Sequence, residues 1–153
     1  MNTKNMRKEA SLSIVEDVKN RKFLMIRHHR GINKGCMNFP GGKKEPNETM
    51  EECVIRETLE ETGISIKNPR KVGYIEFPSV DFYVYVYKST DFEGTLKAHE
   101  EEVNAFWQDA NDIPYQDMRE ADRDFLPDIL AGKYVKRKYV YDANFHIKEI
   151  IDL

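Results

Sequence analysis

The sequence predicts an α/β (α+β) fold in which a mixed β-sheet is sandwiched between helices. About seven or eight segments have the apolar pattern of strands. Only two segments combine helical spacing with capping signals, and the strands do not alternate regularly with the helices. The chain has 153 residues, which suits one domain with a real core, so residues 1–153 are assigned to a single domain.

Two strands are expected near the amino terminus, followed by a basic loop. Residues 10–16 alternate loosely between apolar and polar side chains, and residues 22–27 (KFLMIR) form an apolar run. The loop at residues 28–35 (HHRGINKG) is cationic, so His28 and its neighbours would help to neutralise a polyphosphate. A solvated connection between strands is the alternative interpretation.

A glycine-opened loop then leads into the first helix. Thr49, followed three residues later by Glu52, has the pattern of a capping box, which predicts the start of the helix. Gly63 has the place of the left-handed residue just beyond a helix end, and Ile64 begins the next strand. The helix is therefore expected between residues 49 and 63.

Three carboxylates share one face of this helix. Glu57, Glu60 and Glu61 have i, i+3, i+4 spacing, whereas Ile55 and Leu59 are expected to face the core. Clustered carboxylates repel one another unless a cation neutralises them, and Mg²⁺ or Mn²⁺ does so because these hard cations take oxygen ligands and bridge to phosphates. A solvated acidic helix laced by ion pairs is the alternative.

The spacing of these residues resembles the Nudix box of hydrolases that act on nucleoside-diphosphate-linked substrates. The match consists of Gly42, five residues, Glu48, seven residues and then Arg56-Glu57-x-x-Glu60-Glu61-x-Gly63-Ile64. Thr58 departs from the usual aliphatic residue and lies toward the core side. The resemblance implies a Nudix fold and an Arg56–Glu48 pair that holds the loop on the helix. It also implies Mg²⁺, with Mn²⁺ as a substitute, bound by Glu57, Glu60, Glu61 and the Gly42 carbonyl.

One further acidic residue is implied after the helix. Glu102 lies five residues before Trp107, the spacing at which MutT-type members carry a glutamate that ligates metal or serves as base. Glu101 is the next candidate, and a solvated acidic run is the alternative. The resemblance therefore gives the catalytic set Arg56, Glu57, Glu60, Glu61 and Glu102, with the base left open among Glu57, Glu60 and Glu102.

Residues that would contact a base come from separate segments. By resemblance, Asn38 reads a purine edge, because an amide offers both a donor and an acceptor; turn formation is its plainer role. Residues 71–77 and 82–88 are expected to form a hairpin. Phe77 and Phe82 flank its turn, where they would sandwich a flat base or pack in the core.

The stretch from Ile113 to Met118 resembles one in 8-oxo-dGTP hydrolases, where an aromatic residue and two acids follow and grip the oxidised purine. Here Arg119 replaces the aromatic residue, Ala121 replaces the first acid, and Asp122 retains the second. Asp122 therefore keeps purine recognition in place, and Arg119 would stack on a base through its planar guanidinium or form a surface ion pair.

The remaining segments complete the predicted sheet. An irregular acidic loop is expected at residues 91–101, a strand at residues 103–107, and a helix at residues 120–131 that ends before Gly132. Residues 133–141 and 145–151 are expected to form a closing hairpin.

Composition restricts the partners. The net charge of −3 argues against a general nucleic-acid or membrane binder, and no apolar run is long enough to span a bilayer. Two cysteines, Cys36 and Cys53, form neither a disulfide framework nor a metal-ligand pattern, which suggests reduced thiols and a cytoplasmic location. A small-molecule nucleotide is the expected partner, and either a monomer or a homodimer is compatible with the sequence.

The leading hypothesis is a Mg²⁺-dependent nucleoside triphosphate pyrophosphohydrolase that releases a nucleoside monophosphate and pyrophosphate, with 8-oxo-dGTP as one candidate substrate. One alternative is a Nudix hydrolase of another substrate, such as ADP-ribose, a dinucleoside polyphosphate or an RNA 5′ end. Another is a non-catalytic Nudix module that senses nucleotides.

Overall fold

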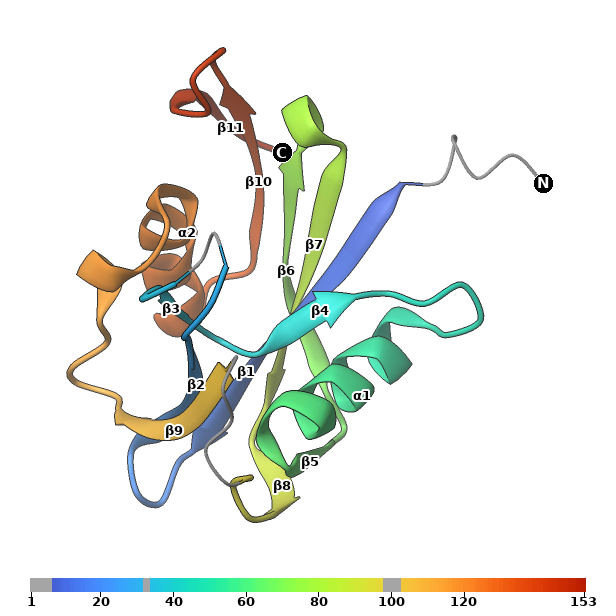
Figure 1. Ribbon diagram of the computed structural model, residues 1–153, viewed down its shortest axis with the longest axis vertical. Coiled ribbons are helices and arrows are strands. Elements are labelled where there is room, and N and C mark those ends of the chain that lie inside the picture. Colours follow the sequence, from blue (N-terminus) through green and yellow to red (C-terminus); the bar gives the residue numbers. More distant parts are fainter. Residues whose placement is uncertain (1–6, 32–33, 98–102) are drawn as a thin grey trace.

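The protein is described by a computed structural model that covers residues 7–31, 34–97 and 103–153. One mixed sheet lies between two helices, with α2 on one side and α1 on the other (Figure 1). The elements, in chain order, are β1 (Lys8–Asp17), β2 (Lys22–His28), β3 (Met37–Asn38), β4 (Gly41–Lys43), α1 (Met50–Thr62), β5 (Ile64–Lys67), β6 (Arg70–Phe77), η2 (Pro78–Val80), β7 (Phe82–Ser89), β8 (Asp91–Gly94), β9 (Val103–Asp109), η3 (Tyr115–Asp117), α2 (Glu120–Leu130), β10 (Val135–Tyr141) and β11 (Ile147–Asp152).

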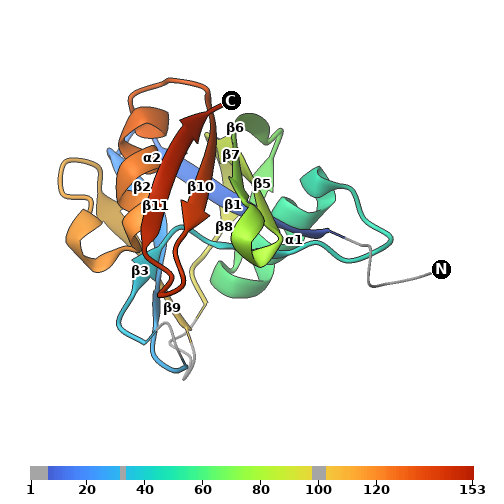
Figure 2. The ribbon, with the colours of Figure 1, turned by 90° about the horizontal axis from the view of Figure 1, so that it is seen from above.

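The strand order of the main sheet is β11-β10-β6-β7-β1-β2-β3, with β4 paired to β1 and β9 paired to β2. The β1–β7 and β10–β6 pairs are parallel, and the other pairs are antiparallel. The view from above shows the helices on either side of the central strands (Figure 2). The predicted fold class and both predicted hairpins are confirmed.

Alternate residues of the central strands supply two separate cores. Ile14 of β1 packs into the larger core, which α2 covers, whereas its neighbour Val15 packs into the smaller core under α1. Met25 and Leu24 of β2 divide in the same way. This division follows from the two-residue period of a strand, which sends neighbouring side chains to opposite faces.

Helix α1 begins and ends where the sequence predicts. The Thr49 side chain accepts the Glu52 N–H and the Glu52 carboxylate accepts the Thr49 N–H, so the capping box is present. Gly63 has φ +85°, which is the left-handed region. Thr58 is fully buried, and its hydroxyl donates to the Val54 carbonyl at 2.6 Å, which satisfies its polar group in the core.

Two expectations were wrong. Leu59 does not face the core, because its side chain is 47% exposed; the buried stripe of α1 instead runs through Val54, Thr58 and Thr62. The segment after residue 90 is not entirely irregular, because β8 pairs with β5 in a small antiparallel sheet.

In the part of the chain that the structure describes, no helix has the length and apolar character needed to cross a membrane.

Candidate active site

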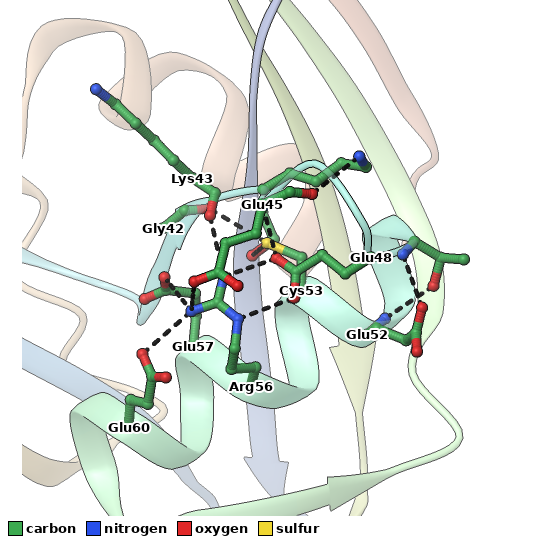
Figure 3. A network of polar contacts seen from close by, with 12 residues as sticks. Gly42, Lys43, Glu45, Glu48, Glu52, Cys53, Arg56, Glu57 and Glu60 are labelled. Carbon is green, nitrogen blue, oxygen red and sulfur yellow. Dashed lines mark hydrogen bonds and ion pairs between the residues drawn. The ribbon is translucent and has the colours of Figure 1, made fainter.

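Arg56 connects the loop before α1 to the acidic face of the helix, which consists of Glu57, Glu60 and Glu61. Its guanidinium donates to both carboxylate oxygens of Glu48, at 2.9 and 2.7 Å, and to the Lys43 carbonyl at 3.1 Å (Figure 3). The same side chain donates to Glu57 at 2.9 Å and to Glu60 at 3.1 Å. This pairing holds the pKa of Glu48 down at about 2, mainly through the Arg56 hydrogen bonds. The structure thus contains the Arg56–Glu48 pair that the sequence resemblance implies.

The two glycines of β4 place the backbone directly against the helix carboxylates. The Gly41 N–H donates to Glu61 Oε1 at 2.8 Å. A Cβ on Gly42 would overlap the Glu57 carboxylate, so only glycine allows this approach. The loop therefore rests on Glu57 and Glu61 at successive residues.

The direction of the β4 peptide groups changes the expected main-chain ligand. Pro40 and Lys44 form backbone hydrogen bonds with β1, and because bonded positions alternate in an antiparallel ladder, Gly42 also directs its N–H and C=O toward β1. The Gly42 carbonyl is further contacted by Cys53 Sγ at 3.5 Å. The N–H and C=O groups of Gly41 instead point away from β1, and its N–H donates to Glu61. The geometry thus favours the Gly41 carbonyl, not that of Gly42, as a metal ligand.

The acidic face has the electrostatics of a cation site. The pKa of Glu61 is raised to about 7, mainly by burial and to a lesser extent by the charges of Glu57 and Glu60, while the hydrogen bond from the Gly41 N–H opposes the shift. Burial also raises the pKa of Glu57, against the opposing effect of Arg56. A buried carboxylate beside two others is stabilised by a cation, and an all-oxygen donor set suits Mg²⁺. These residues therefore fit the metal that the sequence resemblance implies.

The carboxylates of the acidic face do not form a complete metal coordination sphere. Among residues 7–31, 34–97 and 103–153, no three His, Cys, Asp or Glu side chains already form a metal-binding group. Arg56 holds an oxygen of Glu57 and of Glu60, and the Glu60 side chain is 59% exposed. Glu102, the fourth expected carboxylate, lies outside the described residues.

Substitution of Gly42 by alanine tests the close approach of β4 to the helix. The new methyl group would displace the Glu57 carboxylate, so we expect kcat to fall by about tenfold or more while the fold is retained. Steady-state hydrolysis and circular dichroism would measure the two effects. Lys43→Ala, which changes an exposed side chain in the same loop, should leave kcat nearly unchanged. Normal turnover by Gly42→Ala would contradict this account of the site.

A second group of predicted residues meets on the α2 side of the sheet. Asn38 Nδ2 donates to Asp122 Oδ2 at 3.4 Å, although the two residues are 84 positions apart in the chain. Asp122 is only 8% exposed, and burial raises its pKa to about 6, with Arg119 acting in the opposite direction. Burial lowers the pKa of His28, and the charge of Arg119 lowers it further. Asn38, Asp122, Arg119 and His28 are therefore neighbours.

Sequence reasoning missed Tyr141 in this group. Burial raises the pKa of Tyr141, and the charges of Arg119 and Asp122 both act on it, so its hydroxyl lies within their electrostatic reach. The Tyr141 ring stacks on Phe77, with centroids 5.9 Å apart and planes 20° from parallel. The sequence signal was the alternation of aromatic residues at positions 139 and 141, which placed both rings on one face of a strand.

Phe77 and Phe82 do not form a base sandwich. Their ring centroids are 6.4 Å apart with planes inclined by 41°, whereas a base between parallel rings needs about 7 Å. Phe77 is 9% exposed and also stacks on Tyr139 at 5.6 Å. The contacts of Phe77 are therefore those of core packing, and Phe82 packs against the same core.

The chain is similar to known proteins over most of its length. The NUDIX domain family matches residues 6–129. An oxidized purine nucleoside triphosphate hydrolase from Danio rerio is 30% identical over 126 residues, which cover 80% of each chain. An ADP-ribose pyrophosphatase from Methanocaldococcus jannaschii is 35% identical over 100 residues, covering 63% of this chain and 59% of the relative. The crystal structure of a MutT protein from Bacillus halodurans superposes with a TM-score of 0.80 at 24% identity, covering 94% and 96% of the two chains.

Proposed function

Because the chain belongs to the NUDIX family and is a hydrolase of phosphoric anhydride bonds, we propose that it is a Mg²⁺-dependent pyrophosphohydrolase of purine nucleoside triphosphates. The products are the nucleoside monophosphate and pyrophosphate. The observation that carries the choice of a purine is the contact between Asn38 and the buried Asp122. An amide and a carboxyl side by side match the donors and acceptors on the edge of a purine.

The residues that would bind the base lie close to those that would bind the phosphates. Asn38 and Gly41 are three residues apart, which limits their Cα separation to about 10 Å. The base edge would be bound at Asn38 and Asp122, and the phosphates would lie against the acidic face of α1. A nucleotide can bridge this distance, so one molecule would contact both groups of residues.

Each residue of the acidic face has a separate task in the proposed reaction. Arg56 holds Glu48 and the β4–α1 loop in place, and Glu57, Glu60, Glu61 and the Gly41 carbonyl would hold the cation. When bound, Mg²⁺ supplies charge neutralisation at the phosphates and Lewis-acid activation of the attacking water. Glu57, Glu60 and Glu102 are the candidates for accepting the proton of that water. Pyrophosphate leaves as the bond to the attacked phosphorus breaks.

A substrate panel tests the proposal. We expect kcat/KM for dGTP or 8-oxo-dGTP under Mg²⁺ to exceed that for ADP-ribose by about tenfold or more, because ADP-ribose also carries a purine but lacks the triphosphate. Product analysis should detect pyrophosphate, and chelation of the metal should abolish turnover. The ratio between 8-oxo-dGTP and dGTP would measure whether Arg119 and Ala121 still permit selection of the oxidised base.

ADP-ribose hydrolysis is the second candidate, because the relative from Methanocaldococcus jannaschii is named as an ADP-ribose pyrophosphatase. A kcat/KM that favours ADP-ribose over every triphosphate would replace the purine triphosphate proposal. Nucleotide binding without metal-dependent turnover would instead support a sensing role.

A further inference from the structure

The last strand, β11, forms an open edge of the main sheet. Among the described strands, it pairs only with β10 and lies at one end of the strand order (Figure 2). Seven large apolar side chains of the described residues are exposed, and four of them lie on or beside the β10–β11 hairpin: Tyr134, Phe145, Ile150 and Leu153. A sheet edge that carries exposed apolar side chains is a template for pairing with another chain.

Alternate residues of β11 direct their main-chain polar groups away from the sheet. The Leu153 N–H donates to the Lys136 carbonyl at 2.9 Å, so this pair is a bonded position of the β10–β11 ladder. Bonded positions alternate in an antiparallel pair, so Asp152 and Ile150 direct both their N–H and their C=O outward. These groups are available to a further strand.

A bulge near the start of β11 leaves this outward row intact. Val140 is opposite Glu149 and Tyr141 is opposite Ile147, so Lys148 is the extra residue of the bulge. Glu149 occupies a bonded position and directs its N–H to β10. The described peptide bonds are trans, and a trans peptide points its C=O and N–H in opposite directions. The Lys148 carbonyl therefore points outward and continues the row of acceptors.

One antiparallel register allows this edge to pair favourably with a second copy of itself. A twofold axis at Lys148, Glu149 or Asp152 would set identical charges opposite each other. An axis at Ile151 would set the Asp152 carboxylate against Ile150 of the second copy. An axis at Ile150 instead sets Ile150 against Ile150 and Lys148 against Asp152 of the second copy, so that apolar and oppositely charged side chains meet.

From this match we propose that β11 pairs with β11 of a second copy, in a twofold-symmetric homodimer with Ile150 on the axis. The Ile150 N–H of each copy donates to the Ile150 carbonyl of the other, and the Asp152 N–H donates to the Lys148 carbonyl. Each contact occurs twice because the interface is isologous. The Asp152 side chain accepts from Arg137 at 2.8 Å but is 79% exposed, so it can also accept from the Lys148 ammonium.

The surroundings of the edge leave room for the second copy. Adjacent strands are about 4.8 Å apart, so the two β10 strands would be about 14 Å apart. Each α2 helix packs on its own β10 and is about 10 Å wide, so the two helices fit side by side. The two Glu149 side chains become diagonal neighbours about 8 Å apart, and Lys138 of β10 lies diagonal to each on the same side of the sheet.

The same register brings the exposed turn at Phe145 to a hollow on the second copy. This hollow, of about 410 Å³, lies at the end of β11, and Tyr134 and Leu153 are among its lining residues. Ile147 of one copy is opposite Leu153 of the other, so the turn just before Ile147 passes beside the hollow. Phe145 is 70% exposed in the single chain. Its burial in the dimer would remove apolar surface from water and strengthen the pairing.

Cysteine cross-linking tests both the pairing and its register. Bonded residues that are opposite each other in an antiparallel pair have Cα atoms about 5.5 Å apart, which is within disulfide range. Ile150→Cys should therefore give a disulfide-linked dimer of twice 18.0 kDa under mild oxidation with diamide. Asn144→Cys, in the exposed turn of the same hairpin, is the matched control, because its two copies would be more than about 20 Å apart. The wild type measures any background from Cys36 and Cys53.

Sedimentation velocity of the full chain measures the affinity, with loading concentrations from about 1 to 300 µM to bracket a micromolar dissociation constant. The wild type should change from 18.0 kDa to twice that mass as concentration rises. Ile150→Lys sets two like charges together on the axis and should weaken association by about thirtyfold. Phe145→Ala should weaken it by about tenfold, because apolar burial is lost. Val18→Lys, in an exposed turn away from β11, should leave association unchanged.

Circular dichroism checks the fold of each variant, and the changed side chains are exposed, so the fold should be retained. The dimer does not depend on the substrate, since none of these residues belongs to the acidic face or to the purine group. A wild type that stays at 18.0 kDa at every concentration would overturn the proposal. So would an Ile150→Cys protein that cross-links no faster than Asn144→Cys, or a dimer that Ile150→Lys does not weaken.

Discussion

Replacing Glu61 by glutamine is expected to lower kcat by about a thousandfold or more while the protein remains folded. Glu61 lies at the junction of the acidic face and β4, where its carboxylate accepts the Gly41 N–H. Glutamine has a carbonyl oxygen that can accept the same hydrogen bond, but it lacks the negative charge that a divalent cation requires. Loss of one of the few anionic ligands removes charge stabilisation that acts on the transition state.

The stability of the Glu61→Gln variant separates a catalytic role from a structural one. Burial raises the pKa of Glu61 to about 7, so the ionised carboxylate is unfavourable in the metal-free protein at high pH. The neutral amide avoids this cost, and the unfolding midpoint at pH 8 without metal should therefore equal or exceed that of the wild type. Glu51→Gln, an exposed change on the same helix, is the matched control for both measurements.

Calorimetric titration with Mn²⁺ completes this test. The Glu61→Gln variant should bind Mn²⁺ about tenfold or more weakly than the wild type, whereas Glu51→Gln should bind it normally. Near wild-type turnover in a folded Glu61→Gln protein would falsify the assignment of the acidic face as the metal site. Lost turnover with unchanged Mn²⁺ affinity would instead give Glu61 a role that does not involve the cation.

The parts of the site that the sequence predicted are those determined by local geometry. The helical spacing alone places Glu57 and Glu61 on one face, and the Thr49 capping box and Gly63 determine where that helix begins and ends. The Arg56–Glu48 pair spans only eight residues and follows from the same local segment. Interactions of this kind do not depend on how the rest of the chain folds.

The parts that the sequence did not predict depend on strand pairing between distant segments. Whether Gly41 or Gly42 faces the carboxylates is decided by the register of β4 against β1, about thirty residues earlier in the chain. Tyr141 reaches the surroundings of Asp122 only because β10 pairs in parallel with β6, a strand more than sixty residues away. The exposure of Leu59 likewise depends on which stripe of α1 meets the smaller core.

Asp122→Asn is expected to have opposite effects on activity and stability. Ionised Asp122 would accept hydrogen bonds from the N–H groups on the edge of a purine, and an amide presents a donor in place of one of those acceptors. Loss of a charge-assisted hydrogen bond in a buried site costs about 2–3 kcal/mol, which corresponds to roughly a hundredfold in kcat/KM. We expect this loss for purine triphosphates under Mg²⁺ at pH 8.

The same substitution should stabilise the protein without substrate at high pH. The pKa of Asp122 in the folded state is raised to about 6 from an ordinary value of 3.8. The folded state therefore binds the proton more tightly than the unfolded state, and stability falls as pH rises from about 4 to about 6. At about 1.4 kcal/mol per pKa unit, ionisation costs up to about 3 kcal/mol above this window. Asparagine does not ionise, so it avoids the cost.

Urea unfolding at pH 4 and pH 8 measures the predicted difference. The Asp122→Asn variant should be about 1–3 kcal/mol more stable than the wild type at pH 8, and the two proteins should converge near pH 4, where Asp122 is protonated. Glu120→Gln, an exposed change in the same helical turn, should alter neither stability nor kcat/KM. An Asp122→Asn protein that is less stable at pH 8 and fully active would show that this carboxyl supports the fold instead of binding the purine. The combination expected here, lower activity with higher stability, is the signature of a buried charge kept for recognition.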